Sequence, residues 1–436
     1  MSTQLQGCEM DSGIRIHERC LVLAQLSESS DDVTRVYLSA QHYQANALAG
    51  EWMREAGMRV WQDAVGNICG RYEGLTQGAP ALLLGSHLDT VRNAGKYDGI
   101  LGVVTAIEVV RQFHQQGKRF PFAIEIVGFA DEEGVRFDVT LLGSKGLTGE
   151  WEQGWLSKPD HNGLSMAQAL ADFGLNPDLI SQAKRRTEDF IGYLELHIEQ
   201  GPVLETAGLA LGVVSAINGA KRLMITLQGV AGHAGTVPMN LRQDALVGAS
   251  EVVLEVEKIA KEHEVVATVG KLECKPSAVN VIPSLVQFSL DIRAACNDKR
   301  DAALAEILAR IETIAANRQL TFSHHCFYDA DATPCDRLLQ DVLTEAVESV
   351  QGQSLTLPSG AGHDGVAIAA LCPIGMLFMR CEGGVSHHPA EAVKIADIEL
   401  AAKALSLSIK SLARTTDLHH VQMKIQHVVG NDNVQY

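Results

Sequence analysis

The chain has 436 residues, which is too long for one ordinary domain, so we expect two domains or one domain that carries an insertion. Its formal net charge of −17 argues against nucleic acid or an anionic membrane as the main partner. The nine cysteines include no Cys-x-x-Cys pair, no apolar run has the length of a membrane span, and residues 1–13 lack a secretory signal. We therefore expect a cytoplasmic globular protein with reduced thiols, and neither nucleic acid nor a membrane as its partner.

The first part of the chain predicts a parallel sheet. In order, we expect helical structure over residues 15–57, a strand pair over 58–71, a buried strand over 81–84, a helix over 100–116 and a second buried strand over 122–130. The helix has apolar residues at a spacing of three and four, which marks one buried face. A strand, a helix and a strand in this order indicate a βαβ unit.

The second part of the chain predicts an insertion. A strand over 193–198 ends at Gly201-Pro202, and the pattern of the sequence changes near Gly212. Residues 213–329 then follow the order βαββαβ, which is typical of a ferredoxin-like domain. A helix over 336–350, a strand over 374–380 and a helix over 397–412 resume the first domain. We expect an α/β protein with a mixed, mainly parallel sheet flanked by helices over 1–212 and 330–415, the inserted α+β domain over 213–329, and a loosely held tail over 416–436.

Candidate metal ligands stand at the ends of several of these strands. They are His87, Asp98, Glu133, His197 and a histidine of the pair His387-His388. The carboxyl ends of parallel strands lie at one edge of a sheet, so we expect these side chains to meet. Imidazole and carboxylate together suit Zn²⁺ or Mn²⁺, and a carboxylate such as Asp98 can bridge two ions. Two metals activate a water and stabilise a developing oxyanion.

Two acidic residues can support such a centre. Asp89 lies two residues after His87, so in an extended chain it points to the same side and can orient the ring. In the doublet Glu132-Glu133, one carboxylate can bind metal while the other is a general base. Taken alone, each signal has an ordinary alternative, because His-x-Asp is short, an acidic doublet is usually a solvated turn, and His197 fits a half-exposed strand.

Taken together, these segments resemble a known family. The motifs GSHLDTVRNAGKYDG, ADEEGVRF, LELHIEQGPVLE, GHAGTVPM, SGAGHDG and GGVSHHPAE occur in this order between residues 85 and 391. They resemble the dinuclear-metal amidohydrolases of the M20 peptidase superfamily, in the branch of N-carbamoyl-L-amino-acid hydrolases, β-ureidopropionases and allantoate amidohydrolases. GKYDG, FADEEGVRF and GMLFMRCEGGVSHHPAE look most like the allantoate enzymes.

The resemblance implies a role for each candidate. His87, Asp98 and His197 would hold one metal, and Asp98, Glu133 and His387 the other. Glu132 would be the general base, Asp89 would orient His87, and His233 would stabilise the oxyanion. His388 fills a variable position of the family motif, so the ligand is assigned to His387. Manganese is the expected ion and zinc the alternative.

The substrate side is expected to recognise a carboxylate. An arginine fork suits a carboxylate better than lysine does, and Arg293 lies on the polar face of a predicted strand over 286–293. An exposed arginine there is the alternative. The resemblance favours Arg293 as a ligand and adds Gln200, His233, Asn280 and Gly362, although a turn glycine explains Gly362 equally well. Lys221, Arg222 and Arg242 are interpreted as surface charges.

We therefore expect a metal-dependent hydrolase of allantoate that serves purine nitrogen salvage. The alternatives are an N-carbamoyl-L-amino-acid hydrolase or β-ureidopropionase, an M20 peptidase or deacylase, and a non-catalytic binding protein on the same fold. In related enzymes the residue at the position of His233 reaches the site of the partner subunit. The resemblance thus implies a homodimer formed through the inserted domain, which would also be a lid.

Overall fold

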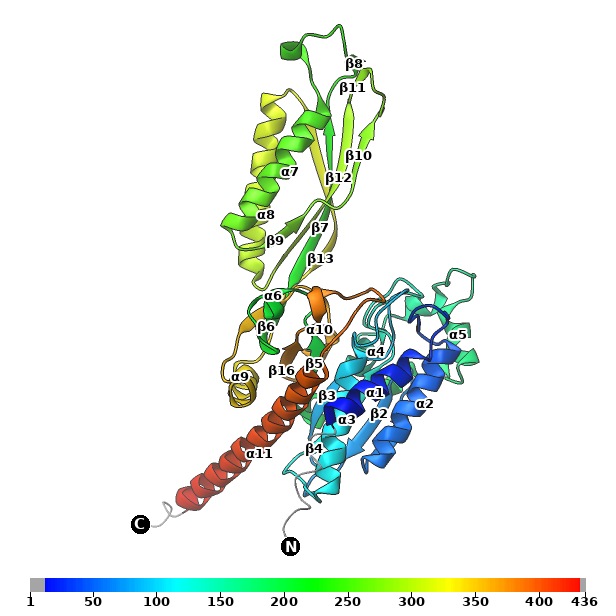
Figure 1. Cartoon of the computed structure of the whole chain (residues 1–436), viewed down its shortest axis with the longest axis vertical. Coiled ribbons are helices and arrows are strands. Elements are labelled where there is room, and N and C mark those ends of the chain that lie inside the picture. Colours follow the sequence, from blue (N-terminus) through cyan, green and yellow to red (C-terminus); the bar gives the residue numbers. More distant parts are fainter. Residues whose placement is uncertain (1–11, 432–436) are drawn as a thin grey trace. The chain divides into compact units, whose positions relative to one another are not determined.

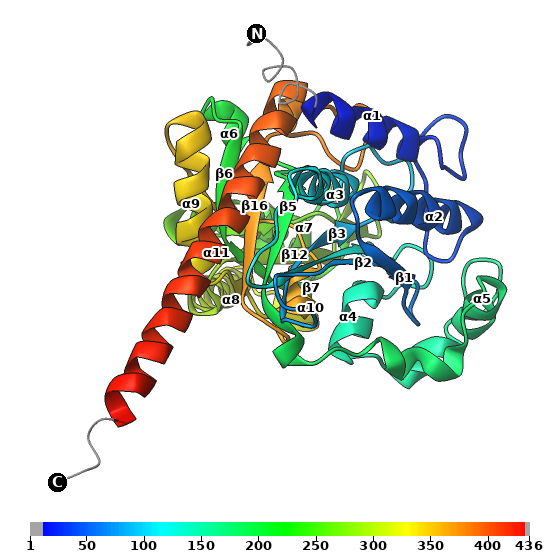
Figure 2. The ribbon, with the colours of Figure 1, turned by 90° about the horizontal axis from the view of Figure 1, so that it is seen from below.

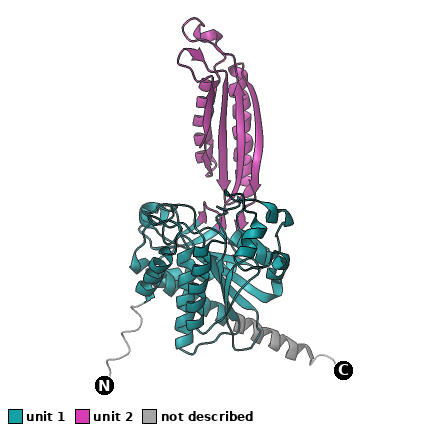
Figure 3. Ribbon diagram, turned by 90° about the vertical axis from the view of Figure 1, so that its right-hand side faces the viewer, with its two compact units in different colours: residues 1–215, 335–357, 363–436 teal, residues 216–334, 358–362 magenta. Residues whose placement is uncertain are grey.

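The computed structural model describes residues 12–431, with side chains described as far as residue 414. These residues form two compact units (Figure 3). The first unit contains residues up to 215 together with 335–357 and the chain from 363 onward, and the second contains 216–334 and 358–362. The second unit overlaps the predicted insertion over 213–329. That this unit is a lid or dimerisation domain stays a prediction.

The first unit is built around a mixed sheet with the strand order β1-β2-β4-β3-β5-β16-β6, and β15 pairs with β6. Its strands are β1 (Arg59–Gln62), β2 (Ile68–Tyr72), β3 (Ala81–His87), β4 (Ala123–Phe129), β5 (Phe190–Ile198), β6 (Leu211–Ile217), β15 (Thr356–Ser359) and β16 (Ile374–Met379). Strands β4, β3, β5 and β16 are adjacent and parallel. Their carboxyl ends therefore lie at the same edge, where α/β proteins place their ligands.

Helices cover both faces of this sheet. They are α1 (Ser12–Ala24), α2 (Ala40–Glu55), α3 (Ile100–Gln115), α4 (Leu142–Thr148), α5 (Met166–Asp172), α6 (Val203–Thr206), α9 (Arg337–Gln351), α10 (Gly365–Ile368) and α11 (Ile395–Asn431). In Figure 2, α1, α2, α3 and α11 lie on one side of the sheet, and α4, α5 and α10 lie on the other. The predicted α/β class is confirmed, with the parallel pairing at the centre of the sheet.

The second unit has the predicted ferredoxin-like order. Its elements are β7 (Gly219–Gln228), β8 (Gly232–His233), α7 (Ala245–Glu262), β9 (Val266–Thr268), β10 (Leu272–Lys275), β11 (Val281–Ile282), β12 (Leu285–Ala294), α8 (Asn297–Asn317), β13 (Thr321–Ala330) and β14 (Thr333–Pro334). The sheet order is β10-β12-β7-β13, β9 also pairs with β12, and β8 and β11 form a separate small ribbon at one end of the unit (Figure 1). Residues of α7 and α8 pack in one apolar core with alternate residues of β7 and β12.

Some element boundaries differ from the sequence prediction. The helical region predicted over 15–57 is two helices, because the polar loop after Ala24 ends at Ser39, whose side chain accepts a hydrogen bond from His42 N and begins α2. The last helix was predicted to end at residue 412 but continues to Asn431. We also expected a loosely held tail over residues 416–436. The side chains of this tail lie outside the described residues, and residues 432–436 lie outside them entirely.

Candidate metal centre

His87, Asp98 and His197 form a buried cluster at the carboxyl edge of the parallel strands. His87 ends β3, His197 lies near the end of β5, and Asp98 lies in the loop before α3. The Oδ1 atom of Asp98 lies 3.6 Å from Nε2 of His87 and 3.1 Å from Nε2 of His197. The three residues are at most 4% exposed, and their ligand atoms lie within 4.8 Å of one another, as a common metal ion requires.

The local backbone fixes which ring nitrogen each histidine presents. Nδ1 of His87 lies 3.0 Å from the carbonyl oxygen of Asp89, and Nδ1 of His197 lies 2.8 Å from that of Ile198. A ring that donates from Nδ1 to a carbonyl has Nε2 left as an acceptor, which is the tautomer of a metal ligand. Gly99 allows the close approach of the loop, because a Cβ there would lie 2.4 Å from the His87 ring and its φ is +69°.

Asp98, Glu133 and His387 form a second cluster that shares the Asp98 carboxylate with the first. Nε2 of His387 lies 3.1 Å from Oδ2 of Asp98 and 3.3 Å from Oε1 of Glu133. His388 instead accepts a hydrogen bond at Nδ1 from Ala390 N. The structure thus brings His387 to the cluster, as expected. His387 has a φ of +55°, a left-handed conformation that is costly for this residue and is typical of functional loops.

The chemistry of these donors fits two divalent cations. Oδ1 of Asp98 and Nε2 of His197 are buried and have no hydrogen-bond partner within the described range, which is costly unless a cation satisfies them. Burial opposes the charge of Asp98, but the imidazoles of His197, His387 and His87 close to it hold the pKa of its carboxyl well below the ordinary value. Asp98 is therefore ionised and offers one oxygen to each cluster. Imidazole with carboxylate suits Mn²⁺ or Zn²⁺.

Asp89 connects the His87 loop to the acidic doublet. Its Oδ1 accepts a hydrogen bond from Glu132 N at 3.0 Å, and its Oδ2 accepts one from Glu133 N at 3.1 Å. Oδ1 also lies 3.5 Å from Nδ1 of His87. Asp89 therefore positions the backbone of both glutamates, in addition to the expected contact with His87.

Glu132 lies beside both clusters. It forms a group with His87 and Glu133 whose ligand atoms lie within 4.8 Å of one another. Burial, followed by the negative charge of Glu133, raises the pKa of the Glu132 carboxyl well above its ordinary value. A carboxylate that holds a proton more readily suits a general base.

Glu391 was not singled out from the sequence, although it ends the quoted segment GGVSHHPAE. The residue is 3% exposed. Oε1 accepts hydrogen bonds from Tyr97 N at 2.7 Å and Asp98 N at 3.2 Å, and Oε2 accepts one from Ser386 Oγ at 3.1 Å. Glu391 thus joins the Asp98 loop to the His387 loop. Its signal in the sequence was its place in that motif.

Two further side chains lie beside the ligands. The ring of His363 is 4.5 Å from that of His197, measured between centroids, and burial together with His197 holds its pKa well below the ordinary value. His363 follows Gly362 in the segment SGAGHDG, from which only the glycine was chosen. Gln200 donates from Nε2 to Oδ2 of Asp98 at 3.0 Å, so this predicted substrate contact does lie at the cluster.

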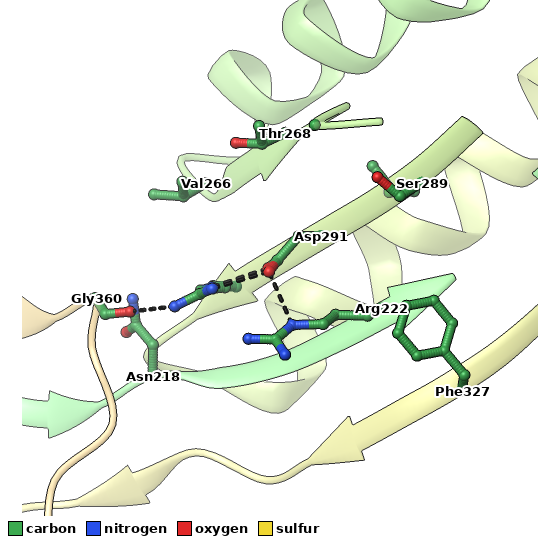
Figure 4. A pocket seen from close by; sticks show the side chains of 11 residues that line it. Asn218, Arg222, Val266, Thr268, Ser289, Asp291, Phe327 and Gly360 are labelled. Carbon is green, nitrogen blue, oxygen red and sulfur yellow. Dashed lines mark hydrogen bonds and ion pairs between the residues drawn. The ribbon is translucent and has the colours of Figure 1, made fainter. Parts of the chain in front are cut away.

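The other predicted substrate residues belong to the second unit. His233 and Asn280 are neighbours, because β8 pairs with β11 and Ala234 N donates to the carbonyl oxygen of Asn280 at 2.9 Å. Arg293 lies near the end of β12, on the polar face predicted from the alternating pattern. It lines a cavity of about 460 Å³ together with Gly360 and other residues of this unit (Figure 4). Gly362 belongs to the short segment 358–362 of the same unit.

A mixed α/β fold with two adjoining sets of imidazole and carboxylate ligands is typical of a two-metal hydrolase. Residues 83–411 match the peptidase family M20/M25/M40. The chain belongs to this family.

Proteins similar in sequence and structure to this chain indicate which bonds it hydrolyses. The chain is 39% identical over 407 residues to the N-carbamoyl-L-amino acid amidohydrolase of Geobacillus stearothermophilus. This alignment covers 93% of this chain and 100% of the relative. It is also 39% identical over 423 residues to the allantoate deiminase of Arabidopsis thaliana, in an alignment that covers 90% of this chain and 80% of the relative. A solved hydantoinase/carbamoylase family amidase from Burkholderia multivorans has 31% identity and a TM-score of 0.86, covering 92% of this chain and 98% of that one.

The protein is therefore a hydrolase of the amidohydrolase type, which acts on carbon–nitrogen bonds other than peptide bonds. In the part of the chain that the structure describes, no helix is both long and apolar enough to cross a membrane.

Proposed function

We propose that this protein hydrolyses a ureido group of allantoate and releases ureidoglycine, ammonia and CO₂ in purine nitrogen salvage. The observation that carries the proposal is the meeting of two ligand sets at Asp98, with the carboxylate of Glu132 beside them. His87, Asp98 and His197 would hold one ion, and Asp98, Glu133 and His387 the other. Two such ions supply an activated water and electrostatic stabilisation of the developing oxyanion.

The side chains of the protein divide the remaining work. Glu132 accepts a proton from the attacking water and returns it to the leaving nitrogen, for which its raised pKa suits it. Asp89 holds the Glu132–Glu133 turn through its two backbone hydrogen bonds. Arg293 and Asn280 bind the substrate carboxylate, Gln200 and the backbone of Gly362 contact the substrate, and His233 stabilises the oxyanion.

The choice of allantoate rests on the segments GKYDG, FADEEGVRF and GMLFMRCEGGVSHHPAE. An N-carbamoyl-L-amino-acid hydrolase is the second candidate, because a relative with that name and a relative named allantoate deiminase are each 39% identical to this chain. Both substrates are ureido acids with a carboxylate close to the scissile group, so one arrangement of Glu132, the metals and Arg293 serves either. They differ in the side chain, which is a second ureido group in allantoate.

Manganese is the proposed working ion, because oxygen and imidazole ligands accept it, although the affinity order favours zinc. A cytoplasmic location is also part of the proposal. Among the residues that the structure describes, eight cysteines are free thiols, at positions 20, 69, 274, 296, 326, 335, 372 and 381. Reduced cysteines are usual in that compartment.

We further propose a homodimer formed through the second unit. His233 and Asn280 lie beyond the Leu285 end of β12, whereas Arg293 lies near its other end. Arg293 lies eight residues along the extended strand from Leu285, a distance of roughly 26 Å. No ureido acid spans that distance, so the two sets can serve one substrate only if they come from different chains. Strand β13, which is exposed over most of its length at the edge of the sheet, offers a surface for pairing.

Hydrolysis by the manganese-loaded protein tests the function, with ammonia release followed for the ureido acids and release of the free amino acid followed for the dipeptides and N-acyl amino acids. Allantoate should be hydrolysed with the highest kcat/KM in a panel with N-carbamoyl-L-amino acids, N-carbamoyl-β-alanine, dipeptides and N-acyl amino acids. A preference for N-carbamoyl-L-amino acids would keep the chemistry and replace the substrate. Turnover of dipeptides or N-acyl amino acids alone would overturn the ureido assignment.

A further inference from the structure

Three charged side chains line the cavity of the second unit. Asp291 is bonded to both Arg293 and Arg222, and Figure 4 shows Arg222 reaching Asp291 from the neighbouring strand. Nε and Nη2 of Arg293 donate to the two oxygens of Asp291, each at 2.8 Å. Nε of Arg222 donates to Oδ2 of the same carboxylate at 3.0 Å. No other residue that lines this cavity carries a charge.

The hydrogen bonds leave one edge of Arg293 open. Asp291 takes the Nε and Nη2 side of the guanidinium, and Nη1 donates to the carbonyl oxygen of Gly360 at 2.8 Å. An arginine has five N–H groups, so these three bonds leave one N–H on Nη1 and one on Nη2. Those two N–H groups can donate to an acceptor in the cavity, such as a carboxylate.

Arg222 determines the net charge of the three side chains that line the cavity. Burial opposes the charge of Asp291, but the hydrogen bonds and charges of Arg293 and Arg222 hold the pKa of its carboxyl below the ordinary value. Asp291 is therefore ionised and by itself would cancel the charge of Arg293. Arg222 restores a net charge of one positive unit, which matches one carboxylate. Arg222 is held in place, because it pairs with Asp291 across the strands and its guanidinium lies 4.7 Å from the centre of the Tyr328 ring.

We propose that Arg222 is a positioning residue for the substrate carboxylate, which acts through Asp291 to keep Arg293 oriented and the cavity positively charged. This inference rests on the proposed function. It gives Arg222 a role beyond that of the surface charge expected from the sequence, which did not show that Arg222 and Arg293 share one aspartate.

Steady-state kinetics of Arg222→Gln on the preferred ureido acid test this role. We expect KM to rise roughly tenfold or more with kcat within about twofold, because the lost interaction binds the carboxylate in ground and transition states alike. Arg222→Lys, which keeps the charge, should give an intermediate KM. In Arg222→Gln with Asp291→Asn the net charge is again one positive unit, so KM should fall back toward that of the unmodified protein.

Arg310→Gln is the matched control. Arg310 pairs with Glu255 in the same unit, with side-chain exposures of 45% and 30%, against 41% and 27% for Arg222 and Asp291. Its KM should not change. Two outcomes would overturn this inference without affecting the proposed function. In one, Arg222→Gln is active and its KM is unchanged; in the other, its KM rises but neither Arg222→Lys nor the double substitution lowers it again. Absence of turnover of every ureido acid by the unmodified protein would overturn the proposed function, and this inference with it.

Discussion

Glu132 and Glu133 are adjacent in the chain, but we assign them different chemistry. Glu133 contacts His387 in the second cluster, while Glu132 has the raised pKa of a proton acceptor. Glu132→Gln should lower kcat by roughly 10²- to 10⁴-fold with the metal content unchanged, as loss of a general base does. Glu133→Gln should instead lose one bound ion per chain. Elemental analysis beside kinetics distinguishes the two, and loss of metal from both variants alike would contradict the assignment.

His42 provides a residue-scale test away from the metal centre. It is fully buried, accepts a hydrogen bond at Nδ1 from Leu38 N at 2.9 Å, and has a pKa that burial lowers to about 4. Between pH 6.5 and 4, the unfolded chain binds a proton that the folded state does not. Stability should therefore fall as the pH falls through this range, by up to about 3 kcal/mol.

The thermal midpoint measured from pH 7 to pH 4.5 should fall more steeply for the unmodified protein than for His42→Gln, which cannot titrate there. Equal slopes for the two proteins would show that His42 is not the group responsible.

At the scale of elements, two loops must come together to build the shared ligand set, and Glu391 bonds to both. Glu391→Ala should weaken metal binding about 10- to 100-fold, as loss of a residue that orients ligands does, and excess metal should restore activity. Competition with a chromogenic chelator measures this affinity. Asp160→Asn is the control, because Asp160 is also a buried carboxylate that accepts two backbone N–H bonds, from Asn162 and Leu164. An equal loss of metal affinity in both variants would mean a general effect on stability.

The elements that could be predicted are those with a strong local pattern. Strand β3 begins with the apolar run over residues 81–84, β4 is mainly apolar, and α3 has a helical apolar spacing bounded by glycines. The two-residue strands β8 and β11 and the two-turn helix α4 have too few positions to show a period. Strand β5 looked half exposed because Glu195 and His197 alternate with apolar residues, but β3 and β16 flank it and both side chains are buried.

The site was predictable only as far as its residues lie in recognisable motifs. The structure brings the predicted set His87, Asp98, Glu133, His197 and His387 together with Glu132. Glu391 and His363 were not chosen from the sequence because their contacts with the cluster join segments far apart in the chain. The left-handed backbone of Gln200 and His387 was equally hidden, because glycine normally marks such positions.

At the scale of the whole molecule, the positions of His233 and Arg293 at opposite ends of β12 predict a site shared by two chains. Neither Glu132→Gln nor His233→Ala should be active alone. Mixed and reassembled, they should recover about a quarter of the full activity, because half of the dimers are mixed and each has one intact site. Activity of the mixture is compared with that of each variant at the same total concentration. A mixture no more active than its parts would contradict the shared site.

The most direct test of the two-metal assignment is a titration of Mn²⁺ into the metal-free protein, with bound metal and ammonia release from the preferred ureido acid followed in the same samples. We predict two ions per chain, activity that reaches its maximum only as the second ion binds, and no tight binding of either ion in Asp98→Ala, because Asp98 belongs to both ligand sets. Full activity with one ion or none, or two tightly bound ions in the Asp98→Ala variant, would contradict the assignment.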